Sequence, residues 1–327
     1  MLVDGSTPVS CFKRSFDLYE QLSETMKGWD LDCRQLGRNR APFELEQLAT
    51  RRLLYSRVYS DCPFYQLGGP LPGFRTFALQ TSISTPFHWC GQSITRQGLI
   101  IFPVGGDFES NSHPGFEIYA LSISEALLEH TAQLYYQRPL SDFLGAKRGV
   151  CNTSPESVAR LRLMLHTLSM GVARWSATNS GPGAGPKILD LEENLAEAVL
   201  RCLQEGRVKF TTGKPSRRMA ALSKALDIIE STPLELLQLP SVLAQVDVSR
   251  RTLEHAFQDR FDISPAAYIK VLRLKALNKA LLYGDKREFS VKEVCQHYGF
   301  HHLGQLASDY DKLFGELPSV TLRRNVT

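Results

Sequence analysis

Apolar and polar positions alternate along short stretches of the chain up to about residue 123. Residues 116 to 124, FEIYALSIS, show this alternation, and residues 98 to 102, GLIIF, form an apolar run that leads into a proline and two glycines. A period of two is typical of β-strands, and dense glycine and proline mark the turns between them. The pattern therefore predicts a mostly antiparallel β region.

The period changes at Ser124. From there the stretch SEALLEHTAQLYYQ predicts a helix, with the serine as its N-cap and a glutamate in the first turn, where it complements the helix dipole. A second helix is predicted to open at Ser154, which caps it, with Pro155 in the first helical position. Helices thus follow the β region.

A third helix is predicted to carry an apolar stripe from Ile188 to Cys202 and to end at Gly206. Before it, residues 176 to 187, SATNSGPGAGPK, are small and rich in glycine and proline, which predicts a flexible loop. We expect the stripe to pack on its own domain, and a subunit interface is the alternative.

From Arg217 onwards the chain shows only helical patterns. A short helix in PSVLAQV, a turn after Asp247 and a longer helix capped by Ser249, SRRTLEHAFQDRF, together predict a helix-turn-helix. The residues of the longer helix that are predicted to face the core are Leu253, Ala256, Phe257 and Phe261.

The same pattern recurs after a long helix predicted from Pro265 to Tyr283. The stretch VKEVCQHY, a turn at Gly299 and a helix in LGQLASDYDKLF predict a second helix-turn-helix. A single amphipathic helix pair is common in any α domain, whereas two units joined by one long helix are a specific arrangement. The residues predicted to face inward are Leu303, Leu306, Tyr310 and Phe314.

The outward side chains of the two longer helices can hydrogen-bond to base edges in a major groove. Arg251 can bind guanine and Gln305 can read adenine, whereas Arg250 is predicted to point closer to the protein. The candidate DNA-binding residues are Arg250, Arg251, Glu254, His255 and Gln258 on the first helix and His301, Gln305, Ser308 and Lys312 on the second.

The formal net charge of +4 lies entirely in the last third of the chain. Residues 214 to 327 hold 17 Lys and Arg against 13 Asp and Glu, and the remainder holds 21 of each sign. This imbalance favours a polyanion as partner of the C-terminal part. No apolar run approaches the length of a membrane span and no secretory signal is apparent, so we expect a cytoplasmic protein without membrane contact.

Cys295, His297, His301 and His302 are the candidates for a metal site. No CxxC pair accompanies them, and His297 precedes the turn that His301 follows. The seven cysteines are scattered singly, which fits reduced thiols. We predict neither a metal nor a cofactor.

Three stretches of the C-terminal part, VSRRTLEHAFQDRF, SPAAYIKVLRLKAL and GFHHLGQLASDYDKLFGELPS, resemble the DNA-binding region of the AraC/XylS family in their order and spacing. Three N-terminal stretches, GWDLDCRQLGR, FPVGGDF and HPGFEIYALSIS, resemble a subgroup that includes the ethanolamine-utilisation operon activator. The chain is thereby identified as a member of this family.

The chain departs from the family pattern at several positions. Asp262 stands where glycine is usual, Leu306 where phenylalanine is customary, and Asn278 where the subgroup often has a basic residue. Asp309 and Asp311 add acid near the predicted DNA side. These departures are expected to weaken the second unit's hold on DNA rather than its fold.

The resemblance implies an α+β fold with two domains. Residues 1–206 would form a β-rich, cupin-like domain with flanking helices that senses an effector and dimerises, and residues 216–327 an all-α DNA-binding domain with two helix-turn-helix units. The function it implies is sequence-specific transcription regulation. The expected mode is activation controlled by an unknown small effector, on double-stranded promoter DNA, with RNA polymerase as partner, in the cytoplasm at the nucleoid.

Two alternatives stay open at this point. One is a cupin-like enzyme fused to a DNA-binding domain, although His88 and His113 stand singly where catalytic cupins have an HxH pair, and we expect no enzyme. The other is a regulator controlled by a protein partner through the stripe from Ile188 to Cys202. The aromatic residues that could line an effector pocket, or simply form core, are Tyr65, Phe87, Trp89, Phe102 and Phe108.

Overall fold

The chain folds into two compact units, one formed by residues 1–34 and 40–212 and the other by residues 35–39 and 213–327. The structure is a computed structural model. It describes residues 9–17, 19–26, 29–37, 41–82, 84–85, 87–104, 108–144, 149–178, 186–210, 217–261, 263–283 and 291–324.

Two sheets form the first unit. The larger has eight strands in the order β1-β3-β4-β11-β6-β9-β12-β13, and all its neighbouring strands are antiparallel. Their bounds are β1 Ser10–Phe16, β3 Phe43–Ala49, β4 Leu53–Ser60, β11 Phe116–Ser124, β6 Phe74–Gln80, β9 Gly98–Ile101, β12 Gly149–Asn152 and β13 Arg207–Phe210. The smaller sheet has the order β2 Asp30–Gln35, β5 Phe64–Gly69, β10 Phe108–Asn111, β7 His88–Trp89 and β8 Gln92–Ser93.

The alternation of strand β11 separates its side chains into two cores, which confirms the predicted β pattern. Tyr119, Leu121 and Ile123 belong to the cluster that also contains the helices, whereas Phe116 and Ala120 belong to a second cluster with residues of the smaller sheet. Both faces of the strand are therefore covered, because each successive side chain points to the opposite face.

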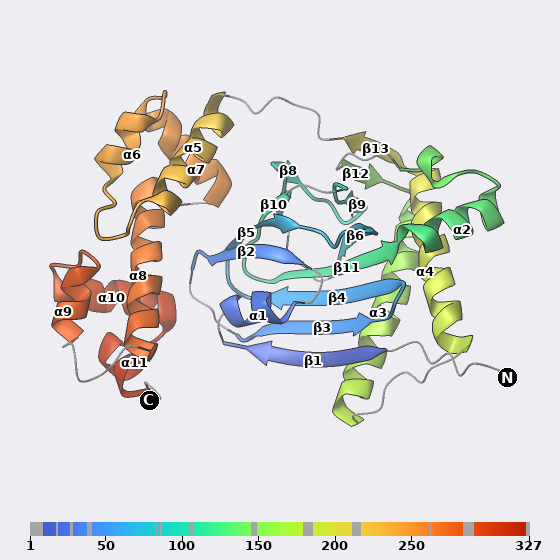
Figure 1. The fold of residues 1–327 in the computed structure, drawn as a ribbon, viewed down its shortest axis with the longest axis horizontal. Helices are drawn as coiled ribbons and strands as arrows, with labels where there is room; N and C mark the ends of the chain where they lie inside the picture. Colours follow the sequence, from blue (N-terminus) through green and yellow to red (C-terminus); the bar gives the residue numbers. More distant parts are fainter. Residues whose placement is uncertain are drawn as a thin grey trace. The chain divides into compact units, whose positions relative to one another are not determined.

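Helices α2, α3 and α4 gather beside the larger sheet (Figure 1). The serine caps are as predicted, since Ser124 Oγ accepts a hydrogen bond from Leu127 N at 3.3 Å and Ser154 Oγ accepts one from Ser157 N at 3.2 Å. The helical segments of this unit are α1 Tyr19–Thr25, α2 Glu125–Tyr136, a 3₁₀ turn Leu140–Asp142, α3 Pro155–Thr178 and α4 Pro186–Glu205.

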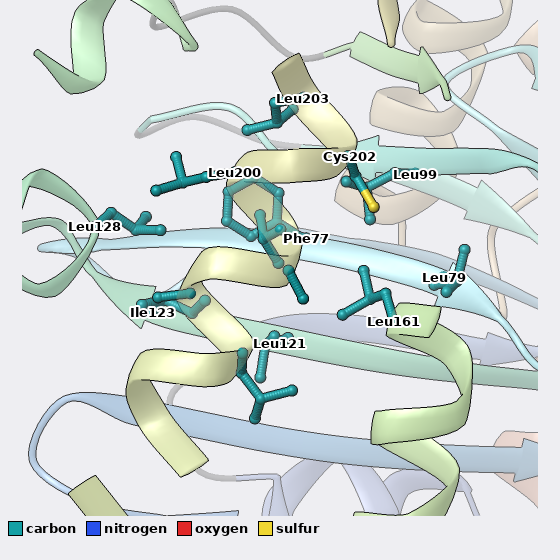
Figure 2. Packing of buried hydrophobic residues seen from close by; sticks show 14 of the residues in the cluster. Phe77, Leu79, Leu99, Leu121, Ile123, Leu128, Leu161, Leu200, Cys202 and Leu203 are labelled. Atoms are coloured by element: carbon teal, nitrogen blue, oxygen red, sulfur yellow. The ribbon is translucent and has the colours of Figure 1, made fainter. Parts of the chain in front are cut away.

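The apolar stripe of α4 packs into its own unit. Figure 2 shows Cys202 and Leu203 of this helix among side chains of the sheet, and Leu195, Val199 and Cys202 are 0% exposed. Most of the stripe therefore packs within its own unit, as expected from the sequence.

Two segments differ from the sequence-based expectation. Residues 176–178 belong to α3 and residues 186–187 to α4, and the remainder of the expected loop, residues 179–185, lies outside the described residues. Residues 207–210, which lie beyond the expected end of the first domain at residue 206, form β13 and pair with β12. Whether such a short strand forms depends on its pairing with a strand distant in the sequence, and not on its local pattern alone.

A charged network that the sequence did not reveal crosses the larger sheet. Arg57 Nε donates to Glu117 Oε1 at 2.6 Å, Arg57 Nη1 donates to Glu46 Oε1 at 3.0 Å, and Lys13 Nζ lies 3.1 Å from the same Glu46 oxygen. Burial alone lowers the pKa of Arg57, but the carboxylates of Glu46 and Glu117 raise it above its usual value. The network ties β1, β3, β4 and β11 together.

The second unit consists of helices. In Figure 1, α8 runs from the group α5 to α7 towards the group α9 to α11. Helix α8 has the predicted bounds, and the short helix α11 was not predicted. The bounds are α5 Arg217–Ser231, α6 Leu239–Gln245, α7 Arg250–Phe261, α8 Pro265–Tyr283, α9 Val291–His297, α10 Leu303–Phe314 and α11 Pro318–Arg324.

Candidate nucleic-acid interface

Helix α7 has one buried and one exposed face, as the sequence predicts. Ser249 Oγ accepts a hydrogen bond from Thr252 N at 3.2 Å, which caps the helix at the predicted serine. The inward residues Leu253, Ala256, Phe257 and Phe261 are at most 2% exposed, whereas Arg251, His255 and Gln258 are exposed. The exposed face therefore carries donors and acceptors and no large apolar side chain.

Arg250 points away from the protein, which corrects the expected direction. Its side chain is 70% exposed, and its Nε donates to Glu254 Oε1 at 2.9 Å, one helical turn further along. Residues four apart lie on the same helix surface, so Glu254 holds the guanidinium along the outer face. Both residues thus belong to the exposed face.

Helix α10 follows a tight turn at Gly299, whose φ of +80° favours glycine. The helix ends at Gly315, whose N–H donates to Asp311 O at 2.8 Å. Leu306 and Tyr310 are buried as predicted, and His301, Gln305, Ser308 and Lys312 are exposed. The second predicted DNA-reading face therefore also lies open.

The inward set of α10 needs two corrections. Leu303 is 42% exposed, and Phe314 is only partly buried. Leu313, which was not in the predicted set, is 5% exposed and lies in the core with Leu306.

Asp309 forms an ion pair with a lysine, whereas the sequence suggested an uncompensated negative charge at this face. Lys270 Nζ of α8 lies 3.1 Å from Asp309 Oδ2. Burial raises the pKa of Asp309, but hydrogen bonds from Lys270 and Gln305 lower it below the usual value. The charge of this carboxylate is therefore offset by a lysine.

Asn278 lies inside the second unit and not at the surface where a basic residue was expected. Its Nδ2 donates to Tyr310 Oη at 2.7 Å, and Tyr310 Oη donates to Thr321 Oγ1 at 2.9 Å. Burial raises the pKa of Tyr310 to about 12, so the phenol remains a donor at neutral pH. These bonds join α8, α10 and α11.

We expect Tyr310→Phe to lower the free energy of unfolding of this unit by about 1 to 3 kcal/mol, because it removes the shared hydroxyl and leaves buried polar groups of Asn278 and Thr321 without it. Thermal unfolding of the full chain measures the effect. Tyr283→Phe is the matched control, since Tyr283 is 68% exposed. Equal losses in the two variants would contradict the role of this network.

Arg273 links the two helix-turn-helix units. Its Nε donates to Leu234 O at 3.3 Å and its Nη2 to Leu237 O at 2.5 Å, both between α5 and α6. A Cβ at Gly299 would lie 3.2 Å from Arg273 Nη1, so the guanidinium also fills the space beside the second turn. The contacts of Arg273 therefore act together with α8 to fix the position of α7 relative to α10.

The histidines considered for a metal do not converge. Cys295 is 0% exposed in the core, His301 and His302 are exposed, and His297 Nε2 lies 3.2 Å from Glu235 Oε1. No group of three or more His, Cys, Asp or Glu in the part of the chain that the structure describes could hold a metal ion. His88 and His113 of the first unit approach with ring centroids 6.3 Å apart.

A cavity opens between the two sheets of the first unit. Four of the five aromatic residues singled out in the sequence line it, namely Phe87, Trp89, Phe102 and Phe108, whereas Tyr65 does not. Tyr65 is 4% exposed and belongs to the core.

Among the described helices, none combines the length and apolar character that crossing a membrane requires.

Residues 242–324 match the family model of a helix-turn-helix domain. The chain is 29% identical over 147 residues to the "Probable thc operon regulatory protein" of Rhodococcus erythropolis, a match that covers 42% of this chain and 44% of that protein. The matched part therefore spans less than half of that relative's length.

Two further relatives are 30% identical. One is "XylDLEGF operon transcriptional activator 2" of Pseudomonas putida, matched over 116 residues, which are 36% of this chain and 71% of that protein. The other is a solved structure titled as a probable AraC family transcriptional regulator from Rhodopseudomonas palustris CGA009, with a TM-score of 0.31 and coverage of 33% of this chain and 99% of that chain.

Proposed function

The chain belongs to the AraC/XylS family of transcriptional regulators, and from this premise we propose that it recognises a specific DNA sequence by placing α7 and α10 in the major groove. The observation that carries the proposal is the pair of helices within one unit. Each buries an apolar face and exposes side chains that can bind base edges or phosphates.

The exposed residues of the two helices differ in the part of DNA that their side chains can contact. Arg251 is exposed and can make a bidentate contact with guanine. Arg250 is hydrogen-bonded to Glu254, and we propose that it contacts a DNA phosphate. On α10, the exposed Gln305 is the proposed base reader. The remaining contacts that we propose come from His255, Gln258, His301, Ser308 and Lys312.

The first unit is proposed to sense a small effector, and the second to bind promoter DNA. We assign residues 1–206, together with β13, to the sensing domain and residues 216–327 to the DNA-binding domain. The stretches GWDLDCRQLGR and HPGFEIYALSIS favour the subgroup that includes the ethanolamine-utilisation operon activator. The larger sheet and its apolar cavity support sensing rather than catalysis.

Activation, with RNA polymerase as partner, is the proposed mode, and the proposed place is the cytoplasm at the nucleoid. A homodimer is also proposed. Helix α3 supports it by exposing Leu163 at 65% and Met170 at 60%, seven residues apart and thus on the same side of the helix.

Selection of bound duplexes from a random-sequence pool by the full chain tests the proposal. We expect recovered sites to contain two half-sites about 10 base pairs apart, because two helices on one face of the duplex enter successive major grooves. Recovery of no preferred sequence at low salt would contradict sequence-specific recognition.

We expect Lys312→Ala to weaken operator binding without changing the preferred sequence, because an exposed lysine suits a phosphate. The slope of log affinity against log salt should become less steep by about one, as one phosphate contact is lost. Fluorescence anisotropy at several salt concentrations measures it, with Lys224→Ala on α5 as control. A changed base preference would instead place Lys312 at a base edge.

A further inference from the structure

Helix α8 takes part in two separate cores of the second unit. Near its start, the ring centroid of Tyr268 lies 5.5 Å from that of Phe257 and 4.8 Å from that of Phe261, both on α7. Further along, Leu277 is buried in one cluster with Leu306 of α10. The helices α7 and α10 are therefore packed against different parts of α8.

Helix α8 alone leaves room for rotation between α7 and α10. Its 19 residues span about 28 Å, at about 1.5 Å per residue. Helices bend with radii of about 60 to 100 Å, which over this length turns one end relative to the other by roughly 16 to 27°. One base pair turns the duplex by about 35°. Bending of α8 is thus a large part of the rotation that separates one half-site spacing from the next.

Arg273 lies between the two packed parts of α8. Its guanidinium donates from Nη2 to Leu237 O at 2.5 Å and from Nε to Leu234 O at 3.3 Å, in the connection between α5 and α6. The same group lies against the turn of the second helix-turn-helix, since a Cβ at Gly299 would be 3.2 Å from Nη1. One planar group therefore contacts both helix-turn-helix units away from the axis of α8, where a contact resists bending.

The connection between α5 and α6 takes part of its hydrogen bonding from this guanidinium. Within the connection, Leu236 N donates to Pro233 O at 3.0 Å, whereas the carbonyls of Leu234 and Leu237 are bonded to Arg273. Leu237 is only 1% exposed, and a buried carbonyl that loses its donor is costly. Removal of the guanidinium should therefore loosen this connection.

A second contact between the two helix-turn-helix units is more exposed. His297 Nε2 of α9 lies 3.2 Å from Glu235 Oε1, but the two side chains are 62% and 35% exposed. Exposed pairs of this kind contribute little. The restraint on bending therefore comes mainly from Arg273.

We propose that Arg273 is the positioning residue that sets which half-site spacing the protein accepts. By holding the connection between α5 and α6 against the turn at Gly299, it keeps α8 from bending and holds α7 and α10 at one angle. Arg273 acts through these two helices, and not by reading a base itself. The inference rests on the proposed function, because a spacing has meaning only when both helices dock on DNA.

Fluorescence anisotropy of the full chain on four duplexes tests the proposal. Three carry both half-sites, at the selected spacing, with one base pair removed and with one base pair added, and the fourth carries the first half-site alone. The unmodified chain should bind either altered spacing about tenfold more weakly, because the DNA must be deformed to bring the second half-site back.

Arg273→Met should bind the three two-site duplexes within about threefold of one another, because α8 can then bend to follow the displaced half-site. Its affinity for the single half-site should stay unchanged. Arg273→Lys keeps the charge but lacks the planar fork, so its preference should lie between the two. Lys279→Met, at an exposed position of the same helix, is the control and should keep the tenfold preference.

Circular dichroism establishes that each variant is folded, and Arg273→Lys carries the test if Arg273→Met is not. A merely structural role predicts that the variant loses the same factor on every duplex. That result, with the tenfold preference intact, would overturn the inference. Loss of the preference in Lys279→Met, or equal affinities of the unmodified chain for the three spacings, would overturn it as well.

Failure of the proposed function gives a different result. If the unmodified chain bound the single half-site as tightly as the duplex with both half-sites, docking of two helices would be wrong. Preference for two half-sites in the unmodified chain, with the spacing profile unaltered in Arg273→Met, would leave the proposed function standing and reject only the role of Arg273.

Discussion

Inserting five base pairs between the two half-sites of the operator is expected to reduce specific affinity by roughly a hundredfold or more, towards the level of non-specific DNA. Half a helical turn carries the second half-site to the opposite face of the duplex. Helix α8 and the bonds from Arg273 to Leu234 and Leu237 hold α7 and α10 at one separation, so the protein cannot follow. Titration of full-length protein onto both duplexes measures the loss.

The same five base pairs placed outside both half-sites provide the control and should leave the affinity unchanged. Bending of the inserted DNA can restore part of the binding, and a stiff A-tract insert limits this. Unchanged affinity for the insertion between the half-sites would show that only one of the two helices docks.

Arg251→Ala should lower specific affinity about tenfold or more and relax the preference at one base pair, since a good bidentate contact contributes about 1 to 3 kcal/mol of discrimination. Gln305→Ala should lose less. Its neighbours Gly304 and Ser308 offer little to a base edge, since glycine has no side chain and serine has a short one. Anisotropy titrations on one operator and on its single-base variants measure both effects.

Arg323→Ala on α11 is the matched control, because Arg323 is also exposed but lies outside both reading helices. All three variants should stay folded, since none of the side chains is buried. A larger loss for Gln305→Ala than for Arg251→Ala would reverse the proposed ranking of the two units.

The helices of the second unit were predictable because their signals are local. The cap at Ser249 and the apolar spacing between Pro265 and Tyr283 depend only on neighbouring residues. The exposed positions of Arg251, His255 and Gln258 on α7 could be predicted in the same way. The direction of Arg250 was predicted wrongly, because its hydrogen bond to Glu254, four residues further on, holds it along the exposed face.

Features that depend on distant residues could not be predicted. Lys270 meets Asp309, and Arg57 meets Glu117, only because the fold brings separate elements together. Strand β13 exists through its pairing with β12. The error at Leu303 has a similar origin, since periodicity gives the apolar side of a helix but not how far along it the neighbouring core extends.

Gly299 and Arg273 together restrict how this sequence can diverge. The guanidinium occupies the space that a side chain at position 299 would need, and the positive φ there penalises any other residue as well. A side chain at 299 would therefore require the guanidinium to move by a few tenths of an ångström while it is bonded to Leu234 and Leu237. Position 299 is thus restricted twice, by its own backbone and by an arginine that also serves the first helix-turn-helix unit.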